Sequence, residues 1–147
     1  LAYYSRGGAW YDKRDYDRAI ADYTEAIRLD LKNATYLNER CWARAIANRD
    51  LQQALADCDE SLRLRAGDAN TLDSRGFVYL RLGRLNEAIT DYDAALKIEP
   101  KQAASLYGRG IARLRKGDGA SGKTDIAAAI AIRAGTAEEF KRYGVTP

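Results

Sequence analysis

Residues 117–124 match the pattern of a phosphate-binding loop, G-x-x-x-x-G-K-S/T, with Lys123 directly before Thr124. In such a loop the backbone N–H groups bind phosphate oxygens, the lysine contacts the terminal phosphate and the hydroxyl group holds magnesium. This chemistry requires a buried β-strand immediately before the loop, whereas residues 110–116 carry several basic side chains in helical register. We interpret the match as fortuitous, in a turn between helices. Nucleotide binding at residues 117–124 is kept as a remote alternative.

Other residues suited to catalysis or metal binding are few. Histidine is absent, and the only two cysteines are Cys41 and Cys58. This excludes the usual zinc ligand sets and the catalytic triads that depend on histidine. The cysteines fall on facing helices of one repeat, so a disulfide is geometrically possible, but we expect two buried thiols that act as small apolar groups. The sequence predicts no catalytic residue, no metal site and no cofactor, hence a protein that is not an enzyme.

The composition is that of one folded, helix-rich domain. The chain has 147 residues, of which 46% are hydrophobic and only 2 are proline. Its net charge of +3 comes from 24 basic and 21 acidic residues spread along the sequence, so no basic block indicates nucleic-acid binding. There is no apolar run of membrane-spanning length and no signal-peptide pattern. Because the chain begins at Leu1 without an initiating methionine, we expect a piece of a longer protein, and both a cytoplasmic and a periplasmic location are open.

A period of about 34 residues organises the whole sequence. An apolar residue, an arginine three positions later and then a small residue recur with steps of 34, 35 and 34. The four copies are Tyr3-Arg6-Gly7, Leu37-Arg40-Cys41, Leu72-Arg75-Gly76 and Leu106-Arg109-Gly110. A second series, with steps of 35, 34 and 34, contains Asp22, Asp57, Asp91 and Asp125. The unequal steps indicate one inserted residue in the second copy, in the turn around residues 48–50.

The recurring arginines and aspartates suggest ion pairs. Each of the first three aspartates precedes the next arginine by 18 residues. We expect charge-assisted pairs between neighbouring helices. The alternative is that each arginine covers its helix with its aliphatic part and exposes the guanidinium group to solvent. Either role is structural.

Each period contains two helices. Apolar side chains recur at helical spacing in residues 85–96, and the short break at residues 83–84 predicts an antiparallel helix hairpin. Gly119 and Gly122 are expected to make the second helix of the fourth copy the weakest. After it, Thr136 and Glu139 form a capping-box signature and Gly144 is a helix stop, which predicts a short capping helix.

This pattern resembles the tetratricopeptide repeat family over essentially residues 1–133. The resemblance implies an all-α, right-handed superhelical solenoid of four helix-turn-helix repeats, at about 1–33, 34–68, 69–102 and 103–133, followed by a capping helix and tail at 134–147. The proline that normally ends each unit of the family is present only after the third repeat, as Pro100.

In the resembled family the first helices of successive repeats line a concave groove that binds extended or helical peptides. We therefore expect a non-catalytic module that binds a peptide or protein segment. The matching positions combine aromatic and hydrogen-bonding side chains, of the kind that dominate binding energy. They are Tyr4, Asn38, Trp42, Asp73, Phe77, Arg81, Tyr107 and Ile111.

Two alternatives concern this groove. The neighbouring repeat could cover Trp42 and Phe77, which would make them core residues. The chain could also be a structural spacer, or associate with itself as a homo-oligomer through its uncapped first repeat. The resemblance does not extend to one binding mode of the family, the Lys and Asn clamp for the terminal carboxylate of chaperone tails, because the clamp residues are missing and Glu39 would repel a carboxylate. The positions that match the clamp are Tyr4, Gly8, Glu39, Asn70 and Ser74.

Overall fold

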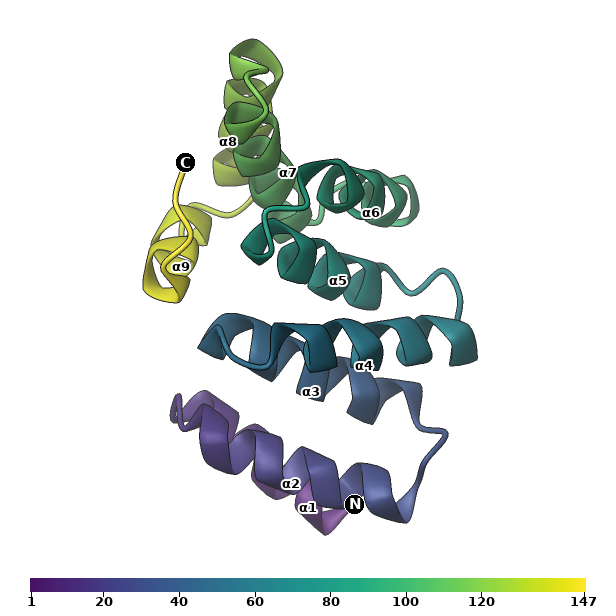
Figure 1. The fold of residues 1–147 in the computed structure, drawn as a ribbon. Helices are drawn as coiled ribbons and strands as arrows, with labels where there is room; N and C mark the ends of the chain where they lie inside the picture. The colour runs from purple at the N-terminus through teal and green to yellow at the C-terminus, as the bar shows by residue number, and fades with distance from the viewer. The chain divides into compact units, whose positions relative to one another are not determined.

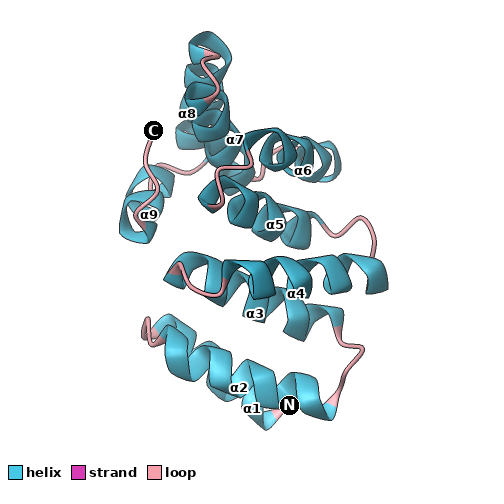
Figure 2. Cartoon of the chain, in the orientation of Figure 1, coloured by secondary structure: helices cyan, strands magenta, loops and turns pink.

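The computed structural model describes residues 1–147 as nine α-helices joined by short loops, with no strand (Figures 1 and 2). Consecutive helices pack as antiparallel pairs in a tetratricopeptide-like solenoid, so the predicted all-α fold is confirmed. No helix has the length and apolar character needed to cross a membrane. The helices are α1 (Ala2–Asp12), α2 (Tyr16–Leu29), α3 (Ala34–Ala47), α4 (Leu51–Leu64), α5 (Ala69–Arg81), α6 (Leu85–Ile98), α7 (Ala103–Arg115), α8 (Gly119–Ile132) and α9 (Thr136–Tyr143).

The chain divides into two compact units. Unit 1 is Leu1–Ala66 and contains α1–α4, and unit 2 is Gly67–Pro147 and contains α5–α9. Each of the four predicted repeat ranges holds one helix pair. Small residues allow the paired helices to approach closely, and Ala19, Ala54 and Ala88 are each fully buried.

The turn inside each pair contains a residue in the left-handed backbone region. This residue is Arg14, Asn48, Gly83 or Gly117. The turn of the second pair has another such residue, Asp50, which immediately precedes α4. The inserted residue therefore lies in this turn, as the unequal sequence steps predicted.

Each recurring arginine forms a bidentate ion pair with an aspartate on the second helix of the same repeat. The Nε and Nη2 atoms donate to the two carboxylate oxygens over 2.7–2.9 Å. The hydrogen bond from Arg6 is the main cause of the lowered pKa of Asp22, and the positive charge of Arg6 lowers it further. Burial acts in the opposite direction and raises this pKa. Charge-assisted pairing between neighbouring helices is confirmed, but the step of 18 residues pointed to the arginine of the next repeat, whereas each arginine bonds to the aspartate of its own helix pair. The pairs are Arg6–Asp22, Arg40–Asp57, Arg75–Asp91 and Arg109–Asp125.

The expectation of two free thiols was wrong. Cys41 on α3 and Cys58 on α4 form a disulfide, with Cα atoms 5.7 Å apart. Both residues are fully buried. The helix pair brings their Cα atoms within the range that a disulfide spans, and this made the bond possible.

The capping helix forms as predicted, but its proposed capping box was wrong. Thr136 is the first residue of α9 and Gly135 is the N-cap, without a side-chain capping bond. The Thr136 hydroxyl donates to the carbonyl oxygen of Arg133, and Glu139 pairs with the Arg133 guanidinium group. Gly144 ends the helix in the left-handed conformation, as predicted.

Gly122 permits direct backbone contact between α7 and α8. A Cβ atom at this position would lie 2.7 Å from a side-chain carbon of Leu114 and 2.8 Å from the carbonyl oxygen of Gly110. Gly119, in contrast, has open space around it. The close helix packing that Gly122 permits therefore compensates in part for the stability that glycine's low helix propensity costs.

We predict opposite effects of alanine at these two glycines. Gly122→Ala should lower the free energy of unfolding by about 1–3 kcal/mol, because a backbone oxygen cannot move aside as a flexible side chain can. Gly119→Ala should be neutral or stabilising by up to about 1 kcal/mol. Urea unfolding of the two variants measures both effects. Stabilisation by Gly122→Ala would contradict the packing role and leave helix propensity as the dominant effect.

Candidate functional site

The candidate residues of unit 1 lie on the first helices of the first two repeats and are partly exposed. Tyr4 on α1 stacks on Tyr36 of α3, with ring centroids 4.9 Å apart. Trp42 donates from its indole Nε1 to the Tyr11 hydroxyl at 2.8 Å, so α1 of the first repeat holds this tryptophan in place. Asn38 lies one helical turn from Trp42, and its buried Oδ1 atom has no hydrogen-bond partner in the chain.

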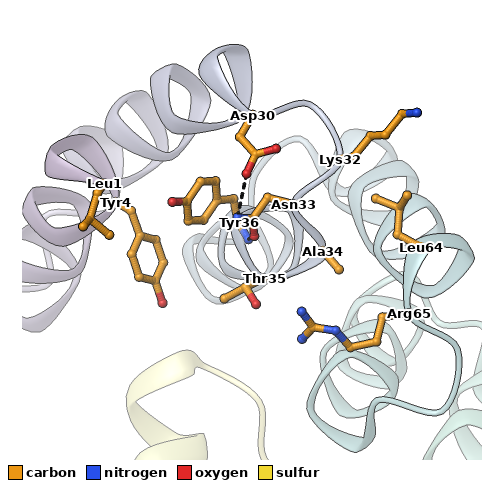
Figure 3. Close-up of a pocket in the computed structure, with 10 residues that line it drawn as sticks. All are labelled: Leu1, Tyr4, Asp30, Lys32, Asn33, Ala34, Thr35, Tyr36, Leu64 and Arg65. Atoms are coloured by element: carbon orange, nitrogen blue, oxygen red, sulfur yellow. Dashed lines mark hydrogen bonds between the residues drawn. The ribbon is translucent and has the colours of Figure 1, made fainter.

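A pocket of about 440 Å³ lies beside Tyr4, between α1, α3 and the end of α4 (Figure 3). Asn33 is one of its lining residues: its Oδ1 atom accepts from the Tyr36 amide, and its Nδ2 atom donates to Asp30 at 3.0 Å, the dashed line in Figure 3. Leu64 and Arg65 line another side. The pocket thus combines aromatic, apolar, basic and acidic groups.

The charge of Glu39 disfavours acidic ligands on this surface. Burial raises the pKa of Glu39. Burial and then the Glu39 charge also raise the pKa of Tyr4 and of Tyr23. A second carboxylate here would meet both low solvation and repulsion.

The candidate aromatic and aliphatic residues of unit 2 are buried. Phe77, Tyr107 and Ile111 are 1%, 4% and 0% exposed. Phe140 of α9 packs against Phe77 and Tyr107, with ring centroids 5.8 Å and 4.7 Å apart. The structure therefore brings Phe77 and Tyr107 together beneath the chain's own last helix. Sequence reasoning missed this role of α9, although Phe140 and Tyr143 are spaced to share one helix face.

Arg81 also contacts the C-terminal segment. Its Nη2 atom donates to the carbonyl oxygen of Tyr143, and its guanidinium group lies over the Phe77 ring. Arg115 donates to the carbonyl oxygen of Thr146 at 3.2 Å. Burial, and secondarily the charge of Arg115, lowers the pKa of Arg81.

Asp73 belongs to a polar network between α5 and α7. The Ser105 hydroxyl donates to Asp73 at 2.7 Å and lies 3.0 Å from the Gln102 side-chain oxygen, while the Gln102 amide donates to Asn70. Burial raises the pKa of Asp73 to about 6, although the hydrogen bond from Ser105 acts to lower it. The network joins the first helices of the third and fourth repeats.

We predict that Asp73 makes stability depend on pH. Its pKa is higher in the folded chain, so its contribution is complete below about pH 4 and is lost as the pH rises to about 6. Asp73→Asn should remove this loss, which we expect to be roughly 2–3 kcal/mol for a pKa raised by about two units. Urea unfolding of both proteins at pH 4 and pH 7 measures the difference. An unchanged pH dependence in the variant would contradict the assignment to Asp73.

Residues 117–124 form a turn and the start of a helix. The Asp118 carboxylate accepts from the Ser121 amide, and the Thr124 hydroxyl donates to the carbonyl oxygen of Ala120. Helix α7 precedes the turn where a phosphate-binding loop has a strand. The predicted turn is confirmed, and the helix itself uses the hydroxyl group that would hold magnesium.

Comparisons with known proteins agree with this architecture. Models described as tetratricopeptide repeat match residues 1–33, 41–106 and 75–138. A search of curated proteins finds no match. The Arabidopsis OM64 TPR domain is 29% identical, with a TM-score of 0.72 over 77% of this chain and 93% of that domain.

Two further solved structures have the same fold. The first TPR of Spaghetti (RPAP3), bound to the HSP90 peptide SRMEEVD, is 23% identical, with a TM-score of 0.74 over 80% of this chain and 92% of that one. The thermophilic TPR protein TTC0263 of Thermus thermophilus is 17% identical, with a TM-score of 0.82 over 97% of this chain and 82% of that one. The repeat matches, the helix pairs and these similarities together show that the chain belongs to the tetratricopeptide repeat family.

Proposed function

We propose that this chain is a non-catalytic module that binds a peptide or protein segment on the first helices of its repeats. The observation that carries the proposal is the surface of Tyr4, Asn38 and Trp42 in unit 1. Its aromatic groups are partly exposed, and Asn38 has a buried acceptor without a partner. A buried polar atom without a hydrogen bond costs roughly 1–3 kcal/mol, so a peptide N–H group that bonded to Asn38 after rotation of its side-chain amide would gain binding energy.

The relatives support a peptide ligand but not the same peptide. The Spaghetti domain binds an acidic HSP90 peptide. In this chain the carboxylate of Glu39 would repel an acidic segment on unit 1, and burial of the site adds the cost of removing a second carboxylate from water. The ligand of unit 1 is therefore neutral or basic near Glu39, and aromatic or apolar where it reaches Tyr4 and the adjacent pocket.

Photo-crosslinking tests the proposal. A photoreactive amino acid at position 38 should crosslink the partner in the source cell, because this position lies at the centre of the surface. The same group at Gln53, an exposed residue of α4, is the matched control. Adding Tyr4→Ala should weaken the crosslink from position 38. Equal products from positions 38 and 53 would contradict the proposal, and a crosslink only to a second copy of the chain would favour self-association.

A further inference from the structure

A segment of the chain itself occupies the surface of unit 2 that corresponds to the candidate groove. This segment, residues 140–146, comprises the end of α9 and the turn after it. Phe140 packs against Phe77 and Tyr107, and Tyr143 packs edge-on against Phe77 with centroids 5.8 Å apart. Figure 1 shows α9, in yellow, next to α7 in unit 2.

Two arginines hold the main chain of this segment. Arg81 and Arg115 donate to the carbonyl oxygens of Tyr143 and Thr146. These bonds depend on the path of a backbone and therefore suit any peptide that follows it. After burial, the Arg115 charge contributes to the lowered pKa of Arg81, as expected where two guanidinium groups lie close enough to repel each other. An acidic side chain near position 146 would relieve this repulsion and form a charge-assisted hydrogen bond.

Helix α9 is the shortest helix and lies outside the helix pairs. It has eight residues and no side-chain N-cap bond, and it follows the last of the helix pairs. Isolated helices shorter than about 12 residues are marginal in water, so α9 depends on its contacts with unit 2. Its release breaks fewer contacts than the opening of a helix pair.

We propose that this surface is a peptide-binding site of unit 2 and that residues 140–146 are its tethered occupant. A partner segment replaces these residues when it binds. This segment has two aromatic residues three positions apart and an acidic residue three positions after the second. The inference rests on the proposed function and names the partner chemistry for unit 2. The aromatic pair takes the places of Phe140 and Tyr143. The acidic residue takes the place of Thr146, beside Arg115, and gives the partner a contact that the tethered segment cannot make. Such a contact is needed because a tethered segment has an effective concentration in the millimolar range.

A synthetic peptide tests the proposal on the full chain. The probe is a fluorescent peptide with the sequence of residues 136–147 carrying Thr146→Glu, and binding is followed by fluorescence anisotropy. The Phe140→Ser substitution should release α9 from the surface. We expect this variant to bind the probe about tenfold or more tightly than the unchanged chain. A probe that keeps Thr146 should bind more weakly. Adding Arg115→Met to the released chain should remove this difference, whereas Lys97→Met, at an exposed position on α6, should not.

Several results would overturn the inference. A folded Phe140→Ser chain, judged by circular dichroism, that binds the probe no better than the unchanged chain would show that α9 does not block a site. If both Phe140→Ser and the milder Tyr143→Ala unfold the chain, α9 is an obligatory part of the core. Equal binding of the two probes would remove the acidic residue from the motif, and a dimer dissociated by the probe would assign the site to α9 of a second copy. None of these results concerns position 38 in unit 1, where crosslinking tests the proposed function independently.

Discussion

Replacement of Asp57 by alanine is expected to lower the free energy of unfolding by roughly 3–5 kcal/mol. Asp57 on α4 accepts hydrogen bonds from both Arg40 and Arg44 of α3, each over 2.7 Å. Its side chain is 7% exposed and those of the two arginines are 16% and 15% exposed. Alanine would leave two largely buried guanidinium groups without their carboxylate. Urea unfolding followed by circular dichroism measures the loss.

The corresponding position of the first repeat provides a matched control. Asp22 pairs with Arg6, whose side chain is 61% exposed. Water can therefore solvate Arg6 after Asp22→Ala, and we expect a much smaller loss of stability. A combined Asp57→Leu, Arg40→Met and Arg44→Met variant should recover much of the loss, because no buried charge is left without a partner. Equal losses for Asp22→Ala and Asp57→Ala would contradict the role assigned to burial.

The repeated sequence made the helix pairs and their ion pairs predictable. Four copies of one pattern average out local irregularities, so the turn at residues 83–84 identified its counterparts elsewhere. The partner of each arginine was less certain, because the constant step of 18 residues pointed from Asp91 to Arg109 as well. In the structure Arg109 bonds to Asp125 of its own repeat and also to Asp93 on the preceding helix. Hairpin packing thus decides the main partner, and the neighbouring repeat adds a second bond.

The state of the candidate groove in unit 2 could not be predicted in the same way. Repeat register assigns Phe77 and Tyr107 to the first helices, but it does not reveal whether another segment covers them. That cover comes from α9, which lies outside the repeats and has no counterpart with which to compare it. Its Phe140 and Tyr143 indicated an apolar helix face without indicating its partner. The position of a segment without a repeat depends on tertiary packing, which local patterns do not encode.

The disulfide could have been recognised from the repeat itself. At the positions of Cys41 and Cys58, the first and third repeats have a glycine on the first helix and a tyrosine on the second. A Cβ atom at Gly76 would lie 2.9 Å from the Tyr92 ring, so these two positions are in direct contact. The second repeat replaces this contact with a pair of cysteines. Two cysteines at positions that touch in the other repeats are placed to form a bond.

Replacement of both cysteines by alanine is therefore expected to lower the free energy of unfolding by about 3 kcal/mol, the chain-entropy value for a loop of this length. The sequence separation is 17 residues. In the unchanged chain, a thiol reductant should produce a similar loss once unfolding exposes the bond. Mass measurement after alkylation without reductant establishes that the bond is present, and urea unfolding with and without reductant measures its contribution.

The repeat also supplies a control that separates the covalent bond from packing. Cys41→Gly with Cys58→Tyr restores the pair found as Gly76 and Tyr92, and Tyr92 is fully buried against that glycine. This variant should be more stable than the double alanine variant, because the tyrosine ring fills the space between α3 and α4. Its stability should not change with reductant. If the glycine–tyrosine variant is no more stable than the alanine variant, then α3 and α4 are spaced to suit the disulfide, and the second repeat is not packed interchangeably with the first and third.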